Sequence, residues 1–298
     1  MSSTTTIAAI ITTHNRRELL ERALNSVLIQ TRPVDQIVVV DDASEDGTDI
    51  LLNEMQKREP RIISVRNSTN LGFAKSRNIA TSHCTTELIA GLDDDDYWLP
   101  PRIETLLAAY VPGTSFVSAS DIHMKPDGSQ KAMVRGYAVT AEQLLYGNNA
   151  GNHGIMRRRD YFAVGGTDES LFALQDCDLW LGLVSAFGPA KTLPDILQVM
   201  DIDPRRERIS SVGSRRFKGH MQFYRKWKPR MNRKQRKYRL LHNYVIRDKR
   251  PSMKRFIQLT TLHNQPWQVY MVLKMYLPFL ATITKKIPHV RKLKKIFT

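Results

Sequence analysis

The feature that most limits how this chain can fold is the alternation of short β-branched runs with helical patterns over its first hundred residues. Ile7–Thr13 is an unbroken apolar run that ends in threonines, as expected for a strand covered on both faces. Further strands are predicted at Gln36–Val40, Arg61–Val65 and Glu87–Leu92, and helices at Thr48–Arg58 and Phe73–Ala80. Such strand–helix alternation with short loops predicts a mostly parallel α/β sheet with right-handed crossovers.

The boundaries of these elements carry local signals. Asn15 has the position of a helix N-cap, with Glu18 three residues later as its capping-box partner. The second half of the chain is less regular. There we predict strands at Ser115–Ser118 and Gly151–Met156, helices at Ala141–Leu145 and Leu174–Leu183, and a basic turn at Arg157–Asp160.

Charge divides the chain into two parts. Residues 1–212 hold 21 Lys+Arg against 28 Asp+Glu, whereas residues 213–298 hold 24 Lys+Arg and a single acid, Asp248. Surfaces selected only for solubility normally mix both signs, so this asymmetry favours an acidic catalytic body and a basic tail that meets an anionic partner. We expect a catalytic domain over 1–212 and a basic, aromatic-rich helical region at 213–298.

Polar residues stand at the ends of three predicted strands. Thr12 is near the end of the first, Asp41-Asp42 follows the second, and Asp93–Asp96 follows the strand Glu87–Leu92. In open α/β sheets ligands bind beyond the carboxyl ends of the strands, so these residues should lie near one another. Four consecutive carboxylates repel one another, and their oxygens suit Mg²⁺ or Mn²⁺ that bridges phosphates. The run therefore favours a metal site, although an acidic surface turn has the same composition.

Several classes of protein are disfavoured. Strand one is followed by Thr12-Thr13-His14-Asn15-Arg16 without a glycine, so the dinucleotide fingerprint is missing, and no P-loop is present. No convincing Ser–His or Cys–His set is visible, and His14 and His153 are expected to be structural or to contact substrate, and not to be ligands. The cysteines Cys84 and Cys177 form neither a metal-ligand pair nor a disulfide framework, and we expect a reducing compartment and no export.

A later pair of motifs adds a second group of acids. Gly165–Glu169 suits a tight turn, and Gln175–Trp180 opens a predicted helix. Asp176 and Asp178 are two positions apart, so they do not share a helix face. An acid in this position can also be a simple partner of the helix dipole.

Taken in order, these motifs resemble glycosyltransferase family 2, the large inverting group with the GT-A fold. The resemblance covers about residues 7–212 and rests on Ile11–Arg16, Val39–Thr48, Asn70–Asn78, Leu92–Trp98 and Gly165–Trp180. It implies a GT-A sheet with flanking helices, with a nucleotide-binding half at 1–100 and an acceptor half at 101–212. It also implies transfer of a sugar from a nucleotide sugar, with Mn²⁺ or Mg²⁺ as cofactor. The processive members' Q-x-x-R-W motif is missing, which implies that a single sugar is added.

The resemblance also implies roles for particular residues. Nucleotide-sugar binding is implied for Thr12, Asn15, Asp42, Lys75, Arg77, Asp93 and Asp94. Asp93 and Asp95 match the D-x-D pair, with Asp95 as the direct metal ligand, although Asp94 and Asp96 leave the register open by one residue. Asp176 matches the general base, and Gln175 stands where the family usually has a glutamate. In that role Asp176 takes the acceptor proton while the metal stabilises charge on the departing diphosphate.

The tail suggests a membrane surface as a further partner. Ile287, Val290, Leu293 and Ile296-Phe297 repeat at helical spacing among basic residues, the pattern of an interfacial helix. The alternative for this stripe is an ordinary core-packing helix with a solvated basic face. The preceding stretch, Trp267–Ile283, is apolar but too interrupted for a membrane span. Nucleic acid is not expected, since no recognition motif accompanies the basic residues.

The hypothesis is therefore a cytoplasmic, peripheral membrane enzyme that uses a UDP sugar. Its acceptor would be a glycan or glycolipid, such as a growing bacterial lipopolysaccharide or a lipid-linked glycan. One alternative is a sugar nucleotidyltransferase, but Thr12–Arg17 lacks the Gly-rich, Arg-containing loop that it needs. Another is a non-catalytic, basic membrane- or nucleic-acid-binding protein on a degenerate transferase fold. The sequence is silent on the oligomeric state.

Overall fold

A computed structural model describes residues 5–203, 205, 213–247, 249–261 and 276. It consists of two compact units, which we treat separately. The first comprises residues 1–170 and 175–206, and the second comprises 171–174 and 207–298, each within its described part.

The first unit is built on one ten-stranded mixed sheet in the order β3-β2-β1-β4-β9-β6-β10-β5, with β7 paired to β6 and β8 to β10. The strands are β1 (Ile7–Thr13), β2 (Gln36–Asp41), β3 (Ile62–Arg66), β4 (Leu88–Asp93), β5 (Tyr97–Trp98), β6 (Phe116–Met124), β7 (Gln130–Met133), β8 (Ala138–Val139), β9 (Gly154–Arg157) and β10 (Ala190–Asp201). The four strands β1 to β4 are parallel, and β9 is antiparallel to both β4 and β6. The expected mostly parallel α/β sheet is therefore present.

The register brings the predicted strand ends together. Thr12 lies opposite Val40 on one side and Asp93 on the other. All seven residues of β1 are buried, as the unbroken apolar run predicts. Parallel strands in this register end at one edge, so the loops after β1, β2 and β4 meet there.

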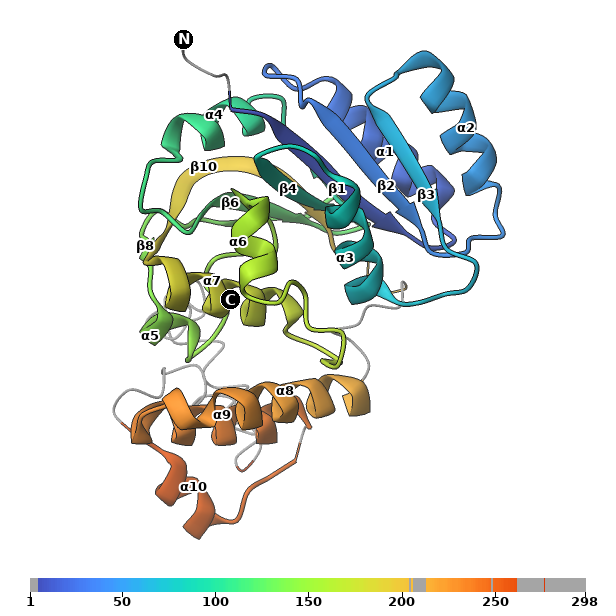
Figure 1. Cartoon of the computed structure of the whole chain (residues 1–298). Helices are drawn as coiled ribbons and strands as arrows, with labels where there is room; N and C mark the ends of the chain where they lie inside the picture. Colours follow the sequence, from blue (N-terminus) through green and yellow to red (C-terminus); the bar gives the residue numbers. More distant parts are fainter. Residues whose placement is uncertain (1–4, 204, 206–212, 248, 262–275, 277–298) are drawn as a thin grey trace. The chain divides into compact units, whose positions relative to one another are not determined.

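Helices cover both faces of this sheet (Figure 1). They are α1 (Arg17–Leu28), α2 (Thr48–Arg58), α3 (Phe73–His83), α4 (Arg102–Ala109), α5 (Ala141–Leu144), α6 (Arg158–Ala163) and α7 (Gln175–Phe187). Leu20 and Leu24 of α1 share a buried cluster with Ile103 of α4 and with Ile7 and Ile11 of β1. On the other face, Ile10 lines a pocket together with residues of α3, α6 and α7, namely Arg77, Tyr161 and Leu179. Burial on both faces explains why the strands are apolar throughout.

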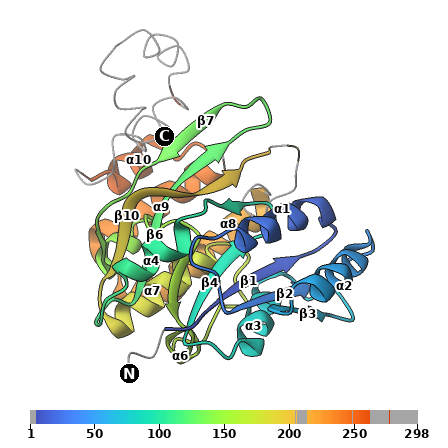
Figure 2. The same ribbon diagram turned by 90° about the horizontal axis from the view of Figure 1, so that it is seen from above.

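The long strand β10 is the main element that the sequence analysis missed. It runs beside β6, with which it pairs in parallel (Figure 2). Pro194-Asp195 interrupts its apolar pattern, and the register shifts between Leu193 and Ile196. A bulge accommodates a proline that a regular ladder would not.

Two local predictions are wrong. Asn15 is not a helix cap: α1 begins at Arg17 after an uncapped N-terminus, and the Arg17 N–H instead donates to Asp46 Oδ2 at 2.9 Å. A carboxylate from the β2–α2 loop thus replaces the cap expected from the local sequence. The basic turn predicted at Arg157–Asp160 is the start of α6, because Asp160 and Tyr161 are buried and draw this segment into the body.

The second unit is helical where it is described. It contains α8 (Gly213–Trp227), a 3₁₀ turn η1 (Lys228–Arg230), α9 (Arg233–Ile246) and α10 (Met253–Leu259). Asn232 and Gln235 form a capping box at the start of α9. Phe223 and Leu241 are fully buried, and the Arg239 guanidinium lies 4.5 Å from the Phe223 ring centroid. Aromatic rings and arginine stems thus form much of this small core.

The sequence analysis also made predictions for two C-terminal stretches and for the two cysteines. The stretch Trp267–Ile283 and the stripe through Ile287, Val290, Leu293 and Ile296 lie outside the described residues, apart from Tyr276. Within the described part of the chain, no helix is long and apolar enough to cross a bilayer. Cys84 and Cys177 are both buried, and neither forms a disulfide.

Candidate active site

Three non-glycine residues have a strained, left-handed backbone conformation. Among the described residues, only Asn15, Ala43 and Leu174 combine a side chain with a positive φ, at 52°, 62° and 67°. They lie after β1, after β2 and just before α7. Side chains in this region cost about 1–2 kcal/mol, and such strain concentrates at functional sites.

The loop after β1 is tied to the loop after β2. Asn15 accepts a hydrogen bond from the Glu45 N–H at 2.7 Å, and its own N–H donates to the Ser44 hydroxyl at 2.9 Å. Thr12 is buried in the strand before it. The Asn15 side chain therefore joins two loops at the sheet edge.

Asp42 organises the next loop. Its carboxylate accepts hydrogen bonds from the N–H groups of Leu71 and Gly72, each at 2.8 Å, and from the Asn67 amide at 2.8 Å. Gly72 has a φ of 85°, which suits a glycine at the start of α3. The carboxylate thus holds the segment that leads into α3.

Each acid of the run Asp93–Asp96 has different partners. Asp94 accepts from the Thr13 hydroxyl and from the Arg16 guanidinium, both at 2.8 Å, and the same guanidinium lies 3.5 Å from Asp95. Burial, reinforced by the charge of Asp95, raises the pKa of Asp94 to about 6 against the opposing effect of Arg16. The repulsion expected within this run is therefore partly offset by one arginine.

Asp96 faces β10. Its two oxygens accept hydrogen bonds from the Gln198 amide and from the Asp201 N–H, both at 3.1 Å. It is almost fully buried. This carboxylate attaches the carboxylate loop, defined as Asp93–Asp96, to the end of β10.

Asp93 lies between two basic side chains. One of its oxygens is 3.3 Å from Arg77 of α3 and the other is 3.2 Å from Nε2 of His153, the residue before β9. Burial acts to raise the pKa of Asp93, but the charges of His153 and Arg77 outweigh it and hold the pKa well below its usual range. Within the described residues, Asp93, Asp96 and His153 form a group whose ligand atoms lie within 4.8 Å of one another, close enough to share a cation.

Asp176 occupies the first turn of α7. Its Oδ2 accepts a 2.6 Å hydrogen bond from the Asn148 amide, which also donates to the Gly151 carbonyl at 3.0 Å. Burial raises the pKa of Asp176, and the charge of Asp93 adds to the rise, while Asn148 opposes it. A carboxylate with a raised pKa is better suited to accept a proton.

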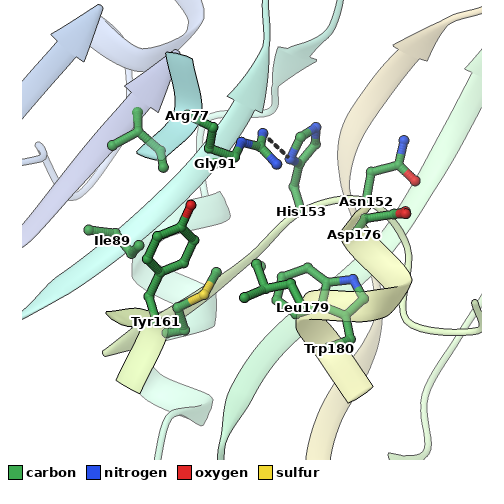
Figure 3. A pocket seen from close by; sticks show the side chains of 12 residues that line it. Arg77, Ile89, Gly91, Asn152, His153, Tyr161, Asp176, Leu179 and Trp180 are labelled. Atoms are coloured by element: carbon green, nitrogen blue, oxygen red, sulfur yellow. Dashed lines mark hydrogen bonds between the residues drawn. The ribbon is translucent and has the colours of Figure 1, made fainter. Parts of the chain in front are cut away.

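A pocket joins this acid to the basic pair (Figure 3). Arg77 and His153 point toward each other, with Arg77 Nη2 3.4 Å from His153 Nδ1, and Asp176 lies on the same cavity wall as Trp180. The Trp180 indole stacks on Phe116 with centroids 4.2 Å apart and donates to the Gly151 carbonyl. The stack of Phe116 and Trp180 and the hydrogen bond to Gly151 hold the start of α7, and hence the position of Asp176.

The structure brings most, but not all, of the predicted site residues together. Thr12, Asn15, Asp42, Arg77, Asp93, Asp94, Asp95 and Asp176 belong to the loops and pocket described above. Lys75 is exposed on α3, two positions from the buried Arg77, and so points away from it.

Several residues at this site were missed by the analysis of the sequence. The roles of Asn148, Arg16 and Arg22 carry no local signal, because their partners Asp176, Asp94 and Asp201 lie 28, 78 and 179 positions away along the chain. His153 was expected to be structural or to contact substrate, and it lies against Asp93. It lies inside the predicted strand Gly151–Met156, whereas β9 begins one residue after it, at Gly154.

Comparisons with known proteins agree with this geometry. Residues 8–165 match the model of the family described as Glycosyl transferase family 2. The chain is 28% identical over 272 residues to the colanic acid biosynthesis glycosyl transferase WcaA of Escherichia coli K12, covering 89% of this chain and 96% of WcaA. It is 30% identical over 121 residues to the Escherichia coli UDP-Glc:alpha-D-GlcNAc-diphosphoundecaprenol beta-1,3-glucosyltransferase WfaP, covering 41% of this chain and 47% of WfaP.

Solved structures show the same fold. TarS 1–349 of S. aureus in complex with UDP-GlcNAc aligns with a TM-score of 0.62 and 18% identity, over 97% of this chain and 87% of TarS 1–349. The mannosyltransferase PcManGT of Pyrobaculum calidifontis, in complex with GDP-Man and Mn²⁺, aligns with a TM-score of 0.62 and 18% identity, over 98% of this chain and 83% of that one. The α/β sheet with flanking helices is thus of the GT-A type, as expected.

Proposed function

The chain belongs to glycosyl transferase family 2, and from that membership we propose that it transfers one sugar from a UDP sugar to an acceptor hydroxyl with inversion at the anomeric carbon. That it is a glycosyltransferase follows from the family and from relatives of that activity, and this removes the nucleotidyltransferase and non-catalytic alternatives. The pocket that joins Asp176 to Arg77 and His153, the two basic residues that contact Asp93, is the observation that carries the finer proposal.

Asp176 is the proposed general base. The acceptor O–H bond breaks as its oxygen attacks the anomeric carbon, the proton passes to Asp176, and the bond from that carbon to the diphosphate breaks. The electron pair leaves with the diphosphate, so the displacement needs no enzyme nucleophile. The raised pKa of Asp176 and the fixed contact with Asn148 support this role.

A divalent cation, Mn²⁺ or Mg²⁺, is the proposed cofactor. The oxygens of Asp93 and Asp96 and the ring of His153 lie close enough to bind one ion, and Asp95, the ligand implied by the family motif, lies next to them in the chain. His153 is buried, and its Nε2 has Asp93 as its neighbour at 3.2 Å. The bound ion would stabilise negative charge on the diphosphate. The complex of PcManGT with GDP-Man and Mn²⁺ supports this assignment by analogy.

The donor nucleotide is proposed to lie against the loops after β1 and β2. These loops hold Thr12, Asn15 and Asp42, with Asp94 beside them and Arg77 and Lys75 on α3. Because the Asp42 carboxylate is already engaged by Leu71 and Gly72, we assign it the role of shaping this binding surface. Arg77 is the proposed positive charge nearest the diphosphate.

The acceptor is proposed to be a lipopolysaccharide or lipid-linked glycan at the inner face of the cytoplasmic membrane. WfaP, whose name specifies a diphosphoundecaprenol acceptor, supports the acceptor class. The region 213–298 is the proposed membrane-binding part. Exposed cations gather around η1, and Met253 and Ile257 of α10 are 53% and 66% exposed beside Lys254 and Arg255. Such a mixture of apolar and basic side chains suits an anionic interface.

The decisive experiment compares Asp176→Asn with Asp178→Asn. Both acids lie in the first turn of α7, and Asp178 is buried on another face, which makes it a matched control. A panel of UDP, GDP and dTDP sugars is first screened by thermal shift with Mn²⁺, where a donor at a hundred times its Kd adds about 2.7 kcal/mol. With the selected donor, we expect Asp176→Asn to lower transfer by roughly 10²–10⁴ and to keep donor binding.

The outcomes separate the alternatives. Normal turnover by Asp176→Asn would exclude it as the base, and a loss confined to Asp178→Asn would transfer that role to Asp178. Excess chelator and Asp95→Ala should each abolish transfer and weaken binding of the nucleoside diphosphate. Unchanged transfer in chelator would exclude the metal.

A further inference from the structure

Arg22 of α1 makes two contacts that have no counterpart in the chemistry proposed so far. Its Nη2 donates to the carbonyl oxygen of Asp95 at 2.6 Å, and its Nη1 lies 3.0 Å from the Asp201 carboxylate. The guanidinium also lies over the Tyr97 ring, 5.1 Å from its centroid. One side chain therefore contacts the carboxylate loop, the residue that follows it and the end of β10.

These contacts close a ring around the carboxylate loop. Asp201, held by Arg22, donates its N–H to Asp96 at 3.1 Å, and Gln198 donates to the same carboxylate from the same strand. Asp96 is joined through the backbone to Asp95, and the Asp95 carbonyl accepts the other hydrogen bond from Arg22, which completes the ring. The loop is thereby fixed to α1 and to β10, whereas Asp94 is fixed separately by Thr13 and Arg16.

We propose that Arg22 is a positioning residue that fixes the carboxylate loop in the arrangement that binds the divalent cation. This inference rests on the proposed function. Arg22 holds the backbone carbonyl of Asp95 and reaches Asp96 through Asp201, so it acts through Asp95 and Asp96. Residues that orient metal ligands in this way typically change metal affinity by about 10–100-fold when they are replaced.

The geometry explains why an arginine is needed. A guanidinium is planar and carries donors that diverge, so it can bind a carbonyl and a carboxylate at once while stacking on a ring. A lysine offers one flexible ammonium and no flat face. Arg22→Lys should therefore keep the positive charge and lose most of the positioning, which separates geometry from charge.

Another arginine in the same unit provides a matched control. Arg61 also binds one carboxylate, that of Glu59 at 2.7 Å, and one carbonyl, that of Val34 at 3.0 Å. Its side chain is 29% exposed, against 35% for Arg22. It precedes β3, at the opposite edge of the sheet from the carboxylate loop. Arg61→Gln thus removes a comparable set of bonds, two to the Glu59 carboxylate and one to the Val34 carbonyl, away from the proposed metal site.

The test measures metal binding directly. Mn²⁺ is titrated into the full chain with saturating UDP, and free Mn²⁺ is followed by electron paramagnetic resonance. We expect Arg22→Gln and Arg22→Lys to weaken Mn²⁺ binding by about tenfold and Arg61→Gln to leave it unchanged. Melting temperatures without metal should fall equally in Arg22→Gln and Arg61→Gln. In transfer assays, raising the Mn²⁺ concentration should restore the kcat of Arg22→Gln.

A double-mutant cycle identifies the ring itself. Asp201→Asn keeps the N–H that binds Asp96 but removes the charge that orients Arg22. Combined with Arg22→Gln, it should add little further loss of Mn²⁺ binding, because both changes break one ring. Additive losses would overturn the ring, and wild-type Mn²⁺ affinity in both Arg22 variants would overturn the positioning role. If the unaltered chain with UDP binds no Mn²⁺, the proposed metal dependence fails and this role fails with it.

Discussion

Replacing Asn148 with alanine should shift the pH dependence of catalysis. Asn148 donates a 2.6 Å hydrogen bond to the Asp176 carboxylate, and this bond favours the ionised form. Removing it should raise the pKa of Asp176 further. Because the proposed base acts only when it is deprotonated, the acid limb of the kcat/KM profile should move to higher pH.

The size of the shift can be worked from the contact. A hydrogen bond to a charged group contributes about 1.5–3 kcal/mol, and one pKa unit corresponds to about 1.4 kcal/mol. The acid limb should therefore move up by about 1–2 units. Above the new pKa the base is again ionised, so most of the activity should return at high pH.

The assay is the initial rate of nucleoside diphosphate release across pH, at low donor concentration and saturating acceptor. Asn149→Ala is the control, since it alters the same loop without removing the bond to Asp176. An acid limb that does not move would refute the argument. A uniform loss of activity at every pH would instead show that Asn148 holds the loop and not the pKa.

Three further outcomes are expected. Ala43→Gly should raise the free energy of unfolding by about 1 kcal/mol in urea titrations, since glycine relieves a φ of 62°, and a lower value would contradict the strain. Cys84 should resist thiol reagents in the native state, because burial raises its pKa to about 12, and rapid labelling would contradict its burial. Replacing Lys228, Arg230 and Arg233 together by glutamine should weaken sedimentation with anionic vesicles and leave donor binding intact, each cation contributing about 1 kcal/mol near the surface. Equal sedimentation would place the membrane contact elsewhere.

The sequence alone determined the framework of the first unit. The apolar run Ile7–Thr13 and its successors specify buried strands, because a strand covered on both faces must be apolar along its length. The alternation with helices makes these strands parallel, and that topology alone gathers Thr12, Asp42 and the carboxylate loop at one edge. Such signals are local and periodic, so they can be read without coordinates.

Tertiary structure decided which charges meet. Arg16 neutralises Asp94 across 78 positions, Arg22 meets Asp201 across 179, and Asn148 meets Asp176 across 28. None of these pairs shares a periodic pattern, and each depends on which loops the folded sheet brings together. The same reason explains why Asn15 is not the helix cap that the local sequence predicts. The first N–H of α1, that of Arg17, donates instead to Asp46, 29 positions away along the chain. Local patterns specify helices and strands. The partners of a buried charge are decided only when the core packs, because a charge that is removed from water must then be paired or hydrogen-bonded.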